Sequence, residues 1–499
     1  MSNRNGSSKG GNFPGNSRLG QKPRNGAKSA KSADKPFAFE TDTRSRMNAP
    51  RKVKLAQPLD DMRMGEFRVD RLGHDGRGIA SWNGKTLFIK GALPGERVNA
   101  RLVRDHSRYA EARLDKVLEP APERVAAPCP HYTRCGGCQL QHLPVDQQLA
   151  FKQQSVLDQL ELWGGVKPRH VLPPIASSGT GYRRCARLGV SYNATVELGF
   201  RQQNSHQLVD INSCLVLAPE LQCLIHPLKA WLSGLEAEKA VTHLELLQTI
   251  DCTVVILRHP EPLALGDIAA LKTIANEQGI SVLLQPGEAH DLRDLDGRSV
   301  NPRLSYALPE FDLSLRFHPQ DFIQVNPEVN ARMVAQAITL LDLKGRERVL
   351  DLFCGIGNFT LPLSRYCAHV VGIEAVESMV ERGRENAQAA SIENAEFIAA
   401  DLLKLTEHRL RQICGKIDAV LLDPPREGAK EIIARLAHIS SKDGQLSPKR
   451  IVYVSCNPAT LARDAKTLAE AGYELDSVGV LDMFPHTAHV ESMALFIRR

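Results

Sequence analysis

Residues from about 320 onward alternate short apolar segments with longer segments of helical character, and this alternation restricts the possible folds more than any other feature of the chain. The apolar segments are residues 348–353, 370–374, 395–401, 417–423 and 451–455, followed by a terminal pair at 477–481 and 492–497. Strands that alternate with helices form a mostly parallel sheet with helices on both faces. The pattern predicts a Rossmann-like, doubly wound α/β domain over residues 321–499.

Three polar motifs coincide with the ends of these predicted strands. They are Asp351-Leu-Phe-Cys-Gly-Ile-Gly-Asn-Phe359, Asp423-Pro-Pro-Arg426 and Ser455-Cys456-Asn457. Open α/β sheets bind ligands and place catalytic groups where their strands end. A cysteine at such an edge can act as a nucleophile. Cys456 therefore predicts an enzyme that bonds covalently to its substrate while a second ligand binds a few residues away.

The glycines and acids that follow the first strands indicate what the second ligand is. Gly355 and Gly357 begin a dinucleotide fingerprint, but Thr360 occupies the position that the fingerprint gives to a third glycine or to alanine. Glu374 ends the second strand, where it can accept hydrogen bonds from ribose hydroxyls. Asp401 ends the third, where it can reach an adenine amino group. This pattern favours S-adenosylmethionine over a dinucleotide.

Three cysteines lie close together in the run Cys129-Pro-His-Tyr-Thr-Arg-Cys135-Gly-Gly-Cys138. Tetrahedral iron or zinc requires a fourth ligand. Zinc sites usually combine one Cys-x2-Cys pair with a second, whereas a single pair preceded by a gap of five residues and a Cys-Pro is more typical of a cubane. We therefore predict an iron–sulfur cluster, with zinc as the alternative. The two glycines would let the backbone approach the cluster and donate N–H groups to sulfur.

The fourth ligand is expected among four downstream cysteines: Cys185, Cys214, Cys223 and Cys252. Cys214 follows an apolar, strand-like segment that ends in a polar turn, which would present its thiol from a loop. Cys185 is flanked by arginines at 183, 184 and 187, in a strand better suited to RNA.

Residues 58–118 alternate apolar and polar side chains between turns rich in Gly and Pro. This pattern predicts a small antiparallel β domain. The segment resembles a TRAM domain, an OB-like RNA-binding barrel, although a barrel that serves only as a packing module is an alternative. Residues 119–320 are then expected to form a central α/β domain that carries the cluster.

Residues 1–57 form a predicted basic tail. They hold 13 Lys and Arg against 3 Asp and Glu, a charge of +10 in a chain whose net charge is +6. This segment is rich in Gly, Ser and Asn and poor in large apolar residues, so we expect it to be disordered. It is either an arm that binds nucleic acid by releasing counterions or a solvated tail with no specific role.

Length and composition narrow the class of protein further. A chain of 499 residues with 42% hydrophobic content is expected to form two to four domains. No uninterrupted apolar stretch approaches twenty residues, and the amino terminus lacks the apolar block of a signal peptide. We therefore expect a cytoplasmic protein with no membrane partner, whose eleven cysteines do not form disulfides.

The ensemble of these segments resembles the bacterial 23S ribosomal RNA uracil-5-methyltransferases that carry an amino-terminal TRAM domain and an iron–sulfur cluster. The resemblance covers roughly residues 58–499. It implies S-adenosylmethionine-dependent methylation of carbon 5 of a uridine in 23S ribosomal RNA. Related tRNA enzymes generally lack both the TRAM domain and the cluster, and a sister rRNA enzyme lacks the TRAM domain. No protein partner is evident, and we expect a monomer.

The resemblance also implies roles for individual residues. It assigns the 4Fe–4S cluster to Cys129, Cys135, Cys138 and Cys214. It assigns the S-adenosylmethionine pocket to Gln324, Phe353, Asn358, Glu374, Asp401 and Asp423. Cys456 would be the nucleophile, and Glu491, in His486-Thr-Ala-His489-Val-Glu491, would be the general base.

The chemistry of uracil explains why such an enzyme needs a thiol and a base. Carbon 5 is too weak a nucleophile to take a methyl group unaided, so a thiolate adds to carbon 6 and turns the ring into an enolate. Carbon 5 then attacks the methyl group. A base must finally remove the carbon 5 proton so that the thiolate can leave.

Four other functions are compatible with parts of the sequence. The first is methylation of uracil in tRNA or another RNA, and the second is methylation of cytosine at carbon 5, which also uses a cysteine adduct. The third is methylation of an exocyclic amine, but Arg426 stands where those enzymes place an aromatic ring, and they have no use for Cys456. The fourth is a ribosome assembly factor whose main activity is RNA binding.

Overall fold

The computed structural model describes residues 64–203, 205–237, 239–288, 290–442 and 447–498. These residues belong to one compact unit that spans Asp42–Arg499. The predicted basic tail, residues 1–57, lies outside the described residues. None of the described helices is long and apolar enough to cross a membrane.

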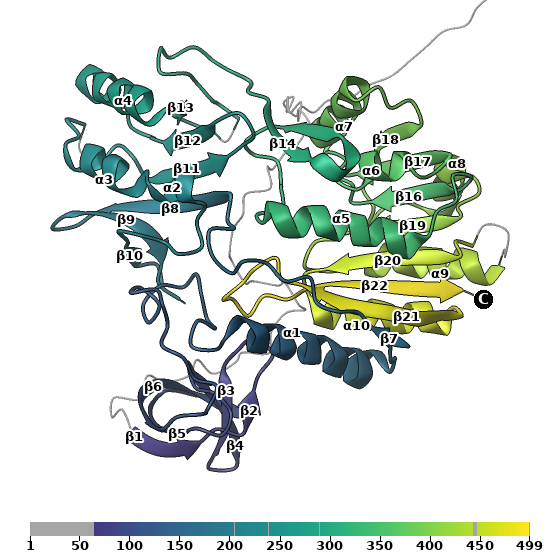
Figure 1. Cartoon of the computed structure of the whole chain (residues 1–499), viewed down its shortest axis with the longest axis horizontal. Helices are drawn as coiled ribbons and strands as arrows, with labels where there is room; N and C mark the ends of the chain where they lie inside the picture. The colour runs from purple at the N-terminus through teal and green to yellow at the C-terminus, as the bar shows by residue number, and fades with distance from the viewer. Residues whose placement is uncertain (1–63, 204, 238, 289, 443–446, 499) are drawn as a thin grey trace, which may run out of the picture. The chain divides into compact units, whose positions relative to one another are not determined.

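The first sheet has six strands in the order β1-β5-β6-β4-β3-β2, and all of its pairings are antiparallel except that of β4 with β6. Figure 1 shows these strands wrapped around one another. Alternating residues such as Leu87 and Ile89, or Val98 and Ala100, point into a small apolar core. This confirms the predicted β domain. Its strands are β1 Met64–Arg68, β2 Arg71–Leu72, β3 Gly78–Trp82, β4 Lys85–Lys90, β5 Arg97–Asp105 and β6 Tyr109–Glu119.

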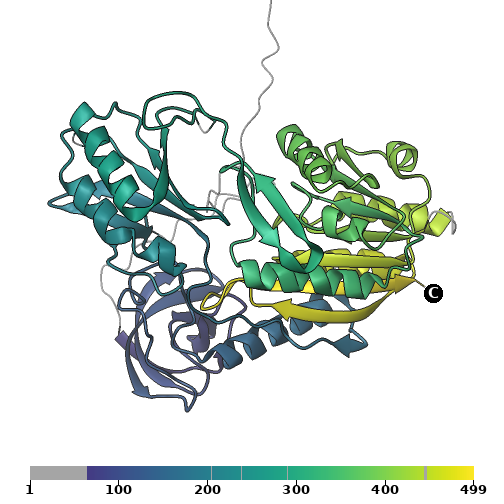
Figure 2. The ribbon, with the colours of Figure 1, turned by 45° about the horizontal axis from the view of Figure 1, so that its top comes forward.

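The second sheet also has six strands, in the order β10-β9-β8-β11-β12-β13. Helices α3 and α4 lie side by side on one of its faces (Figures 1 and 2), and their apolar residues share a core with the strands. The strands are β8 Cys185–Tyr192, β9 Val196–Arg201, β10 Leu208–Asp210, β11 His243–Gln248, β12 Thr253–Arg258 and β13 Ile280–Gln285. The helices are α2 Pro219–Gln222, α3 Ile225–Ser233 and α4 Leu265–Gln278.

A hairpin of β14 (Leu304–Leu308) and β15 (Leu313–Phe317), joined by the short 3-10 helix η2 (Pro309–Phe311), leads to α5 (Pro327–Leu341). From there the chain enters an eight-stranded sheet in the order β18-β17-β16-β19-β20-β22-β21-β7. The strands from β18 to β20 run parallel, and β22 lies antiparallel to both of its neighbours.

This sheet confirms the predicted doubly wound domain, because all seven predicted strands are present. The largest difference is that β21 begins at Tyr473, four residues before the predicted start. The strands are β16 Arg348–Leu352, β17 His369–Glu374, β18 Ala395–Ala399, β19 Ala419–Leu422, β20 Arg450–Ser455, β21 Tyr473–Leu481 and β22 Glu491–Arg498. The helices between them are α6 Thr360–Ser364, α7 Glu377–Ala389, α8 Glu407–Cys414, α9 Lys430–Lys442 and α10 Pro458–Glu470.

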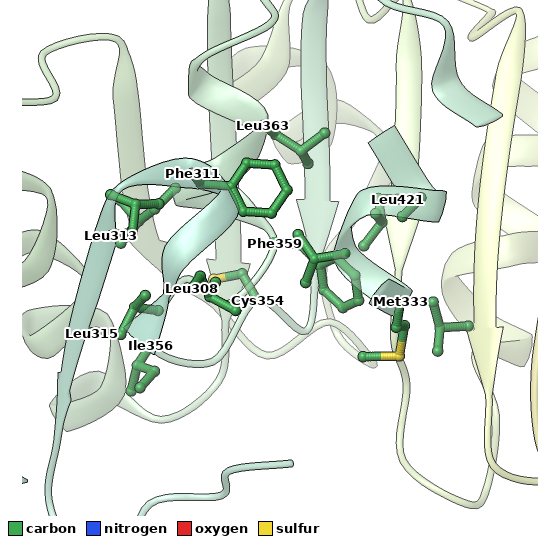
Figure 3. Packing of buried hydrophobic residues seen from close by; sticks show 14 of the residues in the cluster. Leu308, Phe311, Leu313, Leu315, Met333, Cys354, Ile356, Phe359, Leu363 and Leu421 are labelled. Atoms are coloured by element: carbon green, nitrogen blue, oxygen red, sulfur yellow. The ribbon is translucent and has the colours of Figure 1, made fainter. Parts of the chain in front are cut away.

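Successive residues of each strand face opposite layers of helices. Val349 packs in a core with α5, α6 and α7, whereas Leu350 packs in a second core with α8, α9 and α10. Burial on both faces explains why the strands read as continuous apolar runs. Figure 3 shows the first core, in which side chains of the hairpin (Leu308, Leu313, Leu315), of α5 (Met333) and of the loop after β16 (Cys354, Ile356, Phe359) gather together.

One segment from early in the chain joins this last sheet. Helix α1 (Val145–Gln159) and the π-helical turn η1 (Leu160–Gly164) pack their apolar residues against α10, and β7 (His170–Val171) pairs with β21. The boundaries predicted at residues 118 and 320 remain predictions. What the structure adds is that part of the segment between them is built into the C-terminal layers.

Candidate active site

Cys456 lies one residue beyond the buried strand β20, at the carboxyl edge of the sheet. The next residue, Asn457, caps helix α10 by accepting a hydrogen bond from the Ala459 N–H at 3.1 Å, and Pro458 occupies the first helical position. The Asn457 side chain also donates to the Arg426 carbonyl oxygen at 3.0 Å. The thiol is therefore carried by a turn that is tied to the Asp-Pro-Pro-Arg motif.

Glu491 lies opposite Cys456 because of the pairing of two strands. Ser455 of β20 is paired with Ser492 of β22 in an antiparallel ladder, so the residue after Ser455 faces the residue before Ser492. The Ser492 hydroxyl reinforces this register by donating to the Ser455 carbonyl oxygen at 3.2 Å. Glu491 is only 4% exposed. The predicted nucleophile and the predicted base thus meet across two strands.

The site concentrates acidic groups. Burial and then the charges of Glu491 and Asp423 raise the pKa of the Cys456 thiol to about 12, and the Arg426 guanidinium opposes them. Burial and the charge of Asp423 hold the pKa of Glu491 well above its usual range, again opposed by Arg426. Burial raises the pKa of Asp423 to about 7. Arg426 therefore favours the ionised forms of both the thiol and the base.

Gln324 meets Asp423 from the other side of the site. Its amide Nε2 donates to a carboxylate oxygen of Asp423 at 3.4 Å. Asn326, two residues later, caps α5 by accepting from the Val329 N–H at 3.2 Å, and Pro327 follows at the first helical position. Gln324 and Cys456 are thus both presented immediately before a helix that begins with Asn-Pro, which fixes the backbone at each position.

The loop after β16 has the backbone of a close-fitting ligand site. Phe353 has a φ of +63°, and Gly357 has a φ of +99°. A Cβ atom on Gly357 would lie 2.9 Å from the ring of Phe397, so no larger residue fits there. The Gly355 N–H donates to the Glu374 carboxylate at 3.2 Å. Phe353 and Glu374 are therefore brought to the same edge, as predicted for cofactor binding.

Asn358 and Asp401 are placed differently from the other predicted cofactor residues. The Asn358 amide exchanges two hydrogen bonds with Asn330, at 2.9 and 3.0 Å, and accepts a third from the Tyr306 hydroxyl at 2.9 Å. Asp401 pairs with Lys404 at 2.8 Å and lines a hollow of about 350 Å³ that includes none of the other predicted cofactor residues. The hydrogen bonds and ion pair of these two side chains are thus made with residues other than Gln324 and Asp423.

Asp351, the first residue of the motif Asp351–Phe359, is not among the predicted cofactor residues. Asp351 is 1% exposed, and one of its carboxylate oxygens accepts from the Thr360 hydroxyl at 2.5 Å. The other oxygen has no hydrogen-bond partner. Burial raises the pKa of Asp351 to about 8, and the charges of Asp423 and Glu374 add to that rise. A buried, half-satisfied carboxylate beside two other acids is suited to a cationic ligand.

The group of acids fits S-adenosylmethionine, which carries a sulfonium and an ammonium group. The charges of Glu374 and Asp423 both raise the pKa of Asp351, at the point where β16 and β19 are neighbours. Their mutual repulsion is relieved when a cation binds between them. The chemistry of these residues therefore matches the predicted cofactor better than an anionic dinucleotide.

The four predicted cluster cysteines are neighbours in the structure. Cys138 feels the charges of Cys129, Cys135 and Cys214, and Cys214 in turn feels those of Cys129 and Cys135. Burial and, to a lesser extent, the other three thiols raise the pKa of Cys138 to about 12. Cys214 comes from a loop that lies far along the chain from the other three, whereas the remaining candidates are not among these neighbours.

The surroundings of these cysteines supply N–H donors to sulfur. The Gly137 N–H donates to the Cys135 sulfur at 3.4 Å, and the Val216 and Leu217 N–H groups lower the pKa of Cys214. Gly136 fits tightly, because a Cβ atom there would lie 2.8 Å from the Arg201 carbonyl oxygen. Within the described part of the chain, no three His, Cys, Asp or Glu side chains are close enough to hold a single metal ion. The four thiols are nevertheless neighbours, since Cys129, Cys135 and Cys214 all affect the pKa of Cys138.

Comparison with known proteins decides the family. The sequence model of the tRNA (Uracil-5-)-methyltransferase family matches residues 200–499, and that of the TRAM domain matches residues 66–114. The chain belongs to the RNA uracil-5-methyltransferase family. This membership confirms the predicted enzyme class, the fold class with its TRAM domain, and S-adenosylmethionine as the methyl donor.

Curated members of this family are similar over most of their length. The 23S rRNA (uracil(1939)-C(5))-methyltransferase RlmD of Hahella chejuensis is 43% identical over 86% of this chain and 96% of its own. The protein of the same name from Alkalilimnicola ehrlichii is 45% identical over 87% and 96%. Among solved structures, the tRNA (uracil-54, C5)-methyltransferase of Pyrococcus abyssi, in complex with S-adenosyl-L-homocysteine, matches with a TM-score of 0.65 and 25% identity, over 87% of this chain and 100% of its own.

Proposed function

We propose that this family member methylates carbon 5 of a uridine in 23S ribosomal RNA, through a covalent bond between the Cys456 sulfur and carbon 6 of the uracil. The observation that carries this proposal is the position of Cys456 opposite Glu491, beside an acidic pocket at the carboxyl edge of the sheet. The choice of 23S RNA is supported by the relatives that are 43% and 45% identical and carry that name.

The proposed roles of the two catalytic residues follow from their surroundings. In the ligand-free protein the Cys456 thiol holds its proton, because its pKa is raised to about 12. During the reaction this proton passes to solvent as sulfur bonds to carbon 6, and Arg426 favours the thiolate. After methylation, Glu491 takes the proton from carbon 5, and the bond between carbon 6 and sulfur breaks to release thiolate and 5-methyluridine. The raised pKa of Glu491 makes it a stronger base than an exposed glutamate.

We propose that S-adenosylmethionine is held by five residues: Gln324, Asp351, Phe353, Glu374 and Asp423. When bound, this cofactor supplies an electrophilic methyl group and a positive charge. The acids that surround it lose their mutual repulsion, so they are able to ionise at neutral pH. A contact with Asn358 would require its hydrogen bonds to Asn330 and Tyr306 to be exchanged.

We further propose that Cys129, Cys135, Cys138 and Cys214 hold a 4Fe–4S cluster in the segment 119–320. Four thiolates sharing one site require a large compensating positive charge. A cubane takes four cysteine thiolates as ligands, and these four thiols are neighbours. The N–H donors to Cys135 and Cys214 are those that cluster thiolates usually receive.

Nucleoside analysis of cellular RNA tests the proposed substrate. Deleting the gene should remove 5-methyluridine from large-subunit RNA and leave tRNA unchanged. A plasmid with the wild-type gene should restore the modification, and Cys456→Ala should not. Loss from tRNA, or loss of 5-methylcytidine, would overturn the assignment. Full restoration of growth by Cys456→Ala would favour a ribosome assembly factor.

We expect a cytoplasmic monomer, because nothing in the sequence points to another location or partner.

A further inference from the structure

We propose that three residues position the general base. They are Gln148 and Lys152 of α1, and Gln139 of residues 129–143, which we call the cysteine segment. They hold residues 482–490, which we call the base loop and which connect β21 to Glu491 at the start of β22. This proposal rests on the proposed role of Glu491. Figures 1 and 2 show the base loop, in yellow, reaching from the ends of these two strands to the beginning of α1.

His486 is the point at which the base loop is held. It has a φ of +65°, a conformation that costs energy for a residue with a side chain. Its N–H donates to the Gln148 amide oxygen at 2.8 Å. Its carbonyl oxygen accepts from the Gln139 and Leu140 N–H groups, both at 2.9 Å. Contacts from outside the loop therefore maintain a backbone conformation that the loop would not favour by itself.

Gln148 joins the base loop to the cysteine segment. The residue is 1% exposed. Its amide Nε2 donates to the carbonyl oxygens of Leu140 and Leu143, at 3.0 and 2.8 Å, and lies 3.2 Å from the Nδ1 atom of His486. Because both ends of this side chain are used, a single residue links three parts of the structure.

Lys152 holds the first half of the base loop one helical turn further along α1. Its side chain is 0% exposed, and its ammonium donates to the Asp482 carboxylate at 2.8 Å and to the Phe484 carbonyl oxygen at 3.0 Å. The Asp482 carbonyl oxygen accepts from the Asn326 side chain at 3.5 Å. Asn326 caps α5 two residues after Gln324, so the base loop is also linked to the predicted cofactor contact.

Gln139 ties the second half of the base loop to the cysteines. Its side-chain oxygen accepts from the Ala488 N–H at 3.3 Å, and its amide group donates to the Gly136 carbonyl oxygen at 2.8 Å. Gln139 directly follows Cys138. The fold of the cysteine segment therefore determines where the Gln139 side chain and the N–H groups of Gln139 and Leu140 lie. The consequence is that the cysteine segment supports catalysis by positioning Glu491, although it contributes no group to the reaction.

The test compares Gln148→Leu with Gln154→Leu in the full-length holoenzyme. Gln154 lies on the same helix, but it is exposed and its amide donates to the Asp158 carboxylate at 2.7 Å. In Gln148→Leu we expect faster amide hydrogen exchange in residues 482–490 and unchanged iron content. We also expect kcat to fall by up to about 10²-fold, as small misplacements of a catalytic group do, with KM for RNA within about twofold. Methylated enzyme–RNA adduct should accumulate, since the final proton transfer is the step affected. Gln154→Leu should match the wild type.

Two results would overturn the proposal: unchanged exchange in the base loop of Gln148→Leu, or a loss of activity expressed only in KM. If Gln148→Leu does not fold, Gln139→Leu removes the side-chain hydrogen bonds with Ala488 and Gly136 and should change exchange, kcat and adduct level in the same directions by smaller amounts. Glu491→Gln, measured in parallel, separates this proposal from the one on which it rests. If Glu491→Gln turns over normally, the role of Glu491 is wrong, whereas the exchange result still reports whether α1 holds the loop.

Discussion

The catalytic site and the group of Cys129, Cys135, Cys138 and Cys214 both bring acidic side chains together, but the resulting charge is compensated in different ways. In the catalytic site, burial raises the pKa values of Asp351, Asp423 and Glu491, and the exposed Arg426 opposes this rise at Glu491. Among the four cysteines, backbone N–H groups approach the sulfurs of Cys135 and Cys214.

This difference indicates what each site is built to hold. A pocket that leaves acids half-satisfied and has one exposed cation is suited to a positively charged ligand that enters and leaves in every cycle. A site with N–H donors aimed at sulfur is suited to a group that stays.

The largest expected effect comes from Glu491→Gln, which removes the base from the pocket and keeps its shape. We expect kcat to fall by about 10²–10⁴-fold, the usual contribution of general-base catalysis. Enzyme bonded to methylated RNA through Cys456 should accumulate, as seen on denaturing gels and by mass spectrometry of the crosslinked peptide. Glu470→Gln, an exposed glutamate on α10, is the matched control. An adduct on another cysteine would show that the pocket has been assigned the wrong nucleophile.

Cys138→Ser tests whether the second site holds a resident group. Protein purified without oxygen should be brown and contain about four irons per chain, as a cubane requires. We expect the variant to lose most of this iron, because one of the four ligands is gone. Cys223→Ser, an exposed cysteine outside the set, should keep it. Stoichiometric zinc in the wild type would overturn the cluster assignment. Equal loss of iron in both variants would show that Cys138 is no more a cluster ligand than Cys223.

The reactivity of Cys456 sharpens the account of the pocket. Its pKa is raised by burial and by the charges of Glu491 and Asp423. Glu491→Gln should therefore lower this pKa, increase the thiolate fraction and speed alkylation by iodoacetamide several-fold at pH 8. Peptide mass spectrometry gives the rate at Cys456, with the exposed Cys223 as an internal reference. An unchanged rate at Cys456 would mean that Glu491 does not control the thiol.

The smallest effect is expected on stability. Because the folded-state pKa of Asp351 is raised to about 8, the folded ligand-free protein binds more protons than the unfolded chain between about pH 4 and pH 8. The contribution of Asp351 to the free energy of unfolding is therefore lost as pH rises through that range. Asp351→Asn removes this loss, so it should raise the Tm relative to wild type by a few degrees at pH 8 and by less at pH 5. Scanning fluorimetry checks the sign; a gap that narrows with rising pH would contradict it.

Much of the fold was predictable because buried parallel strands are continuous apolar runs, and these are visible without knowing what covers them. For the same reason Cys456, Glu374 and Asp423 could be placed at one edge, since each ends or follows such a run. Asn358 shows the limit of this reasoning. It lies in the right loop, but its hydrogen bonds to Asn330 and Tyr306 depend on α5 and the β14–β15 hairpin.

The cysteines also show what a sequence pattern can and cannot predict. Three of them stand close together in the chain, and their spacing alone indicated a metal or cluster. The choice of Cys214 over the other candidates came from a family resemblance, because spacing says nothing about which distant loop folds back. The structure groups Cys214 with the three through the packing of its loop.

What the sequence by itself determined is therefore local: which segments are strands, where each one ends, and which reactive side chains stand at those ends. The meeting of Cys456 with Glu491 was decided only by the antiparallel register of β20 with β22. The support of the base loop by Gln148 and Lys152 was decided only by the packing of α1 against the C-terminal layers. Both depend on contacts between residues far apart in the chain, and such contacts arise from how whole elements bury their surfaces together, which no local pattern specifies.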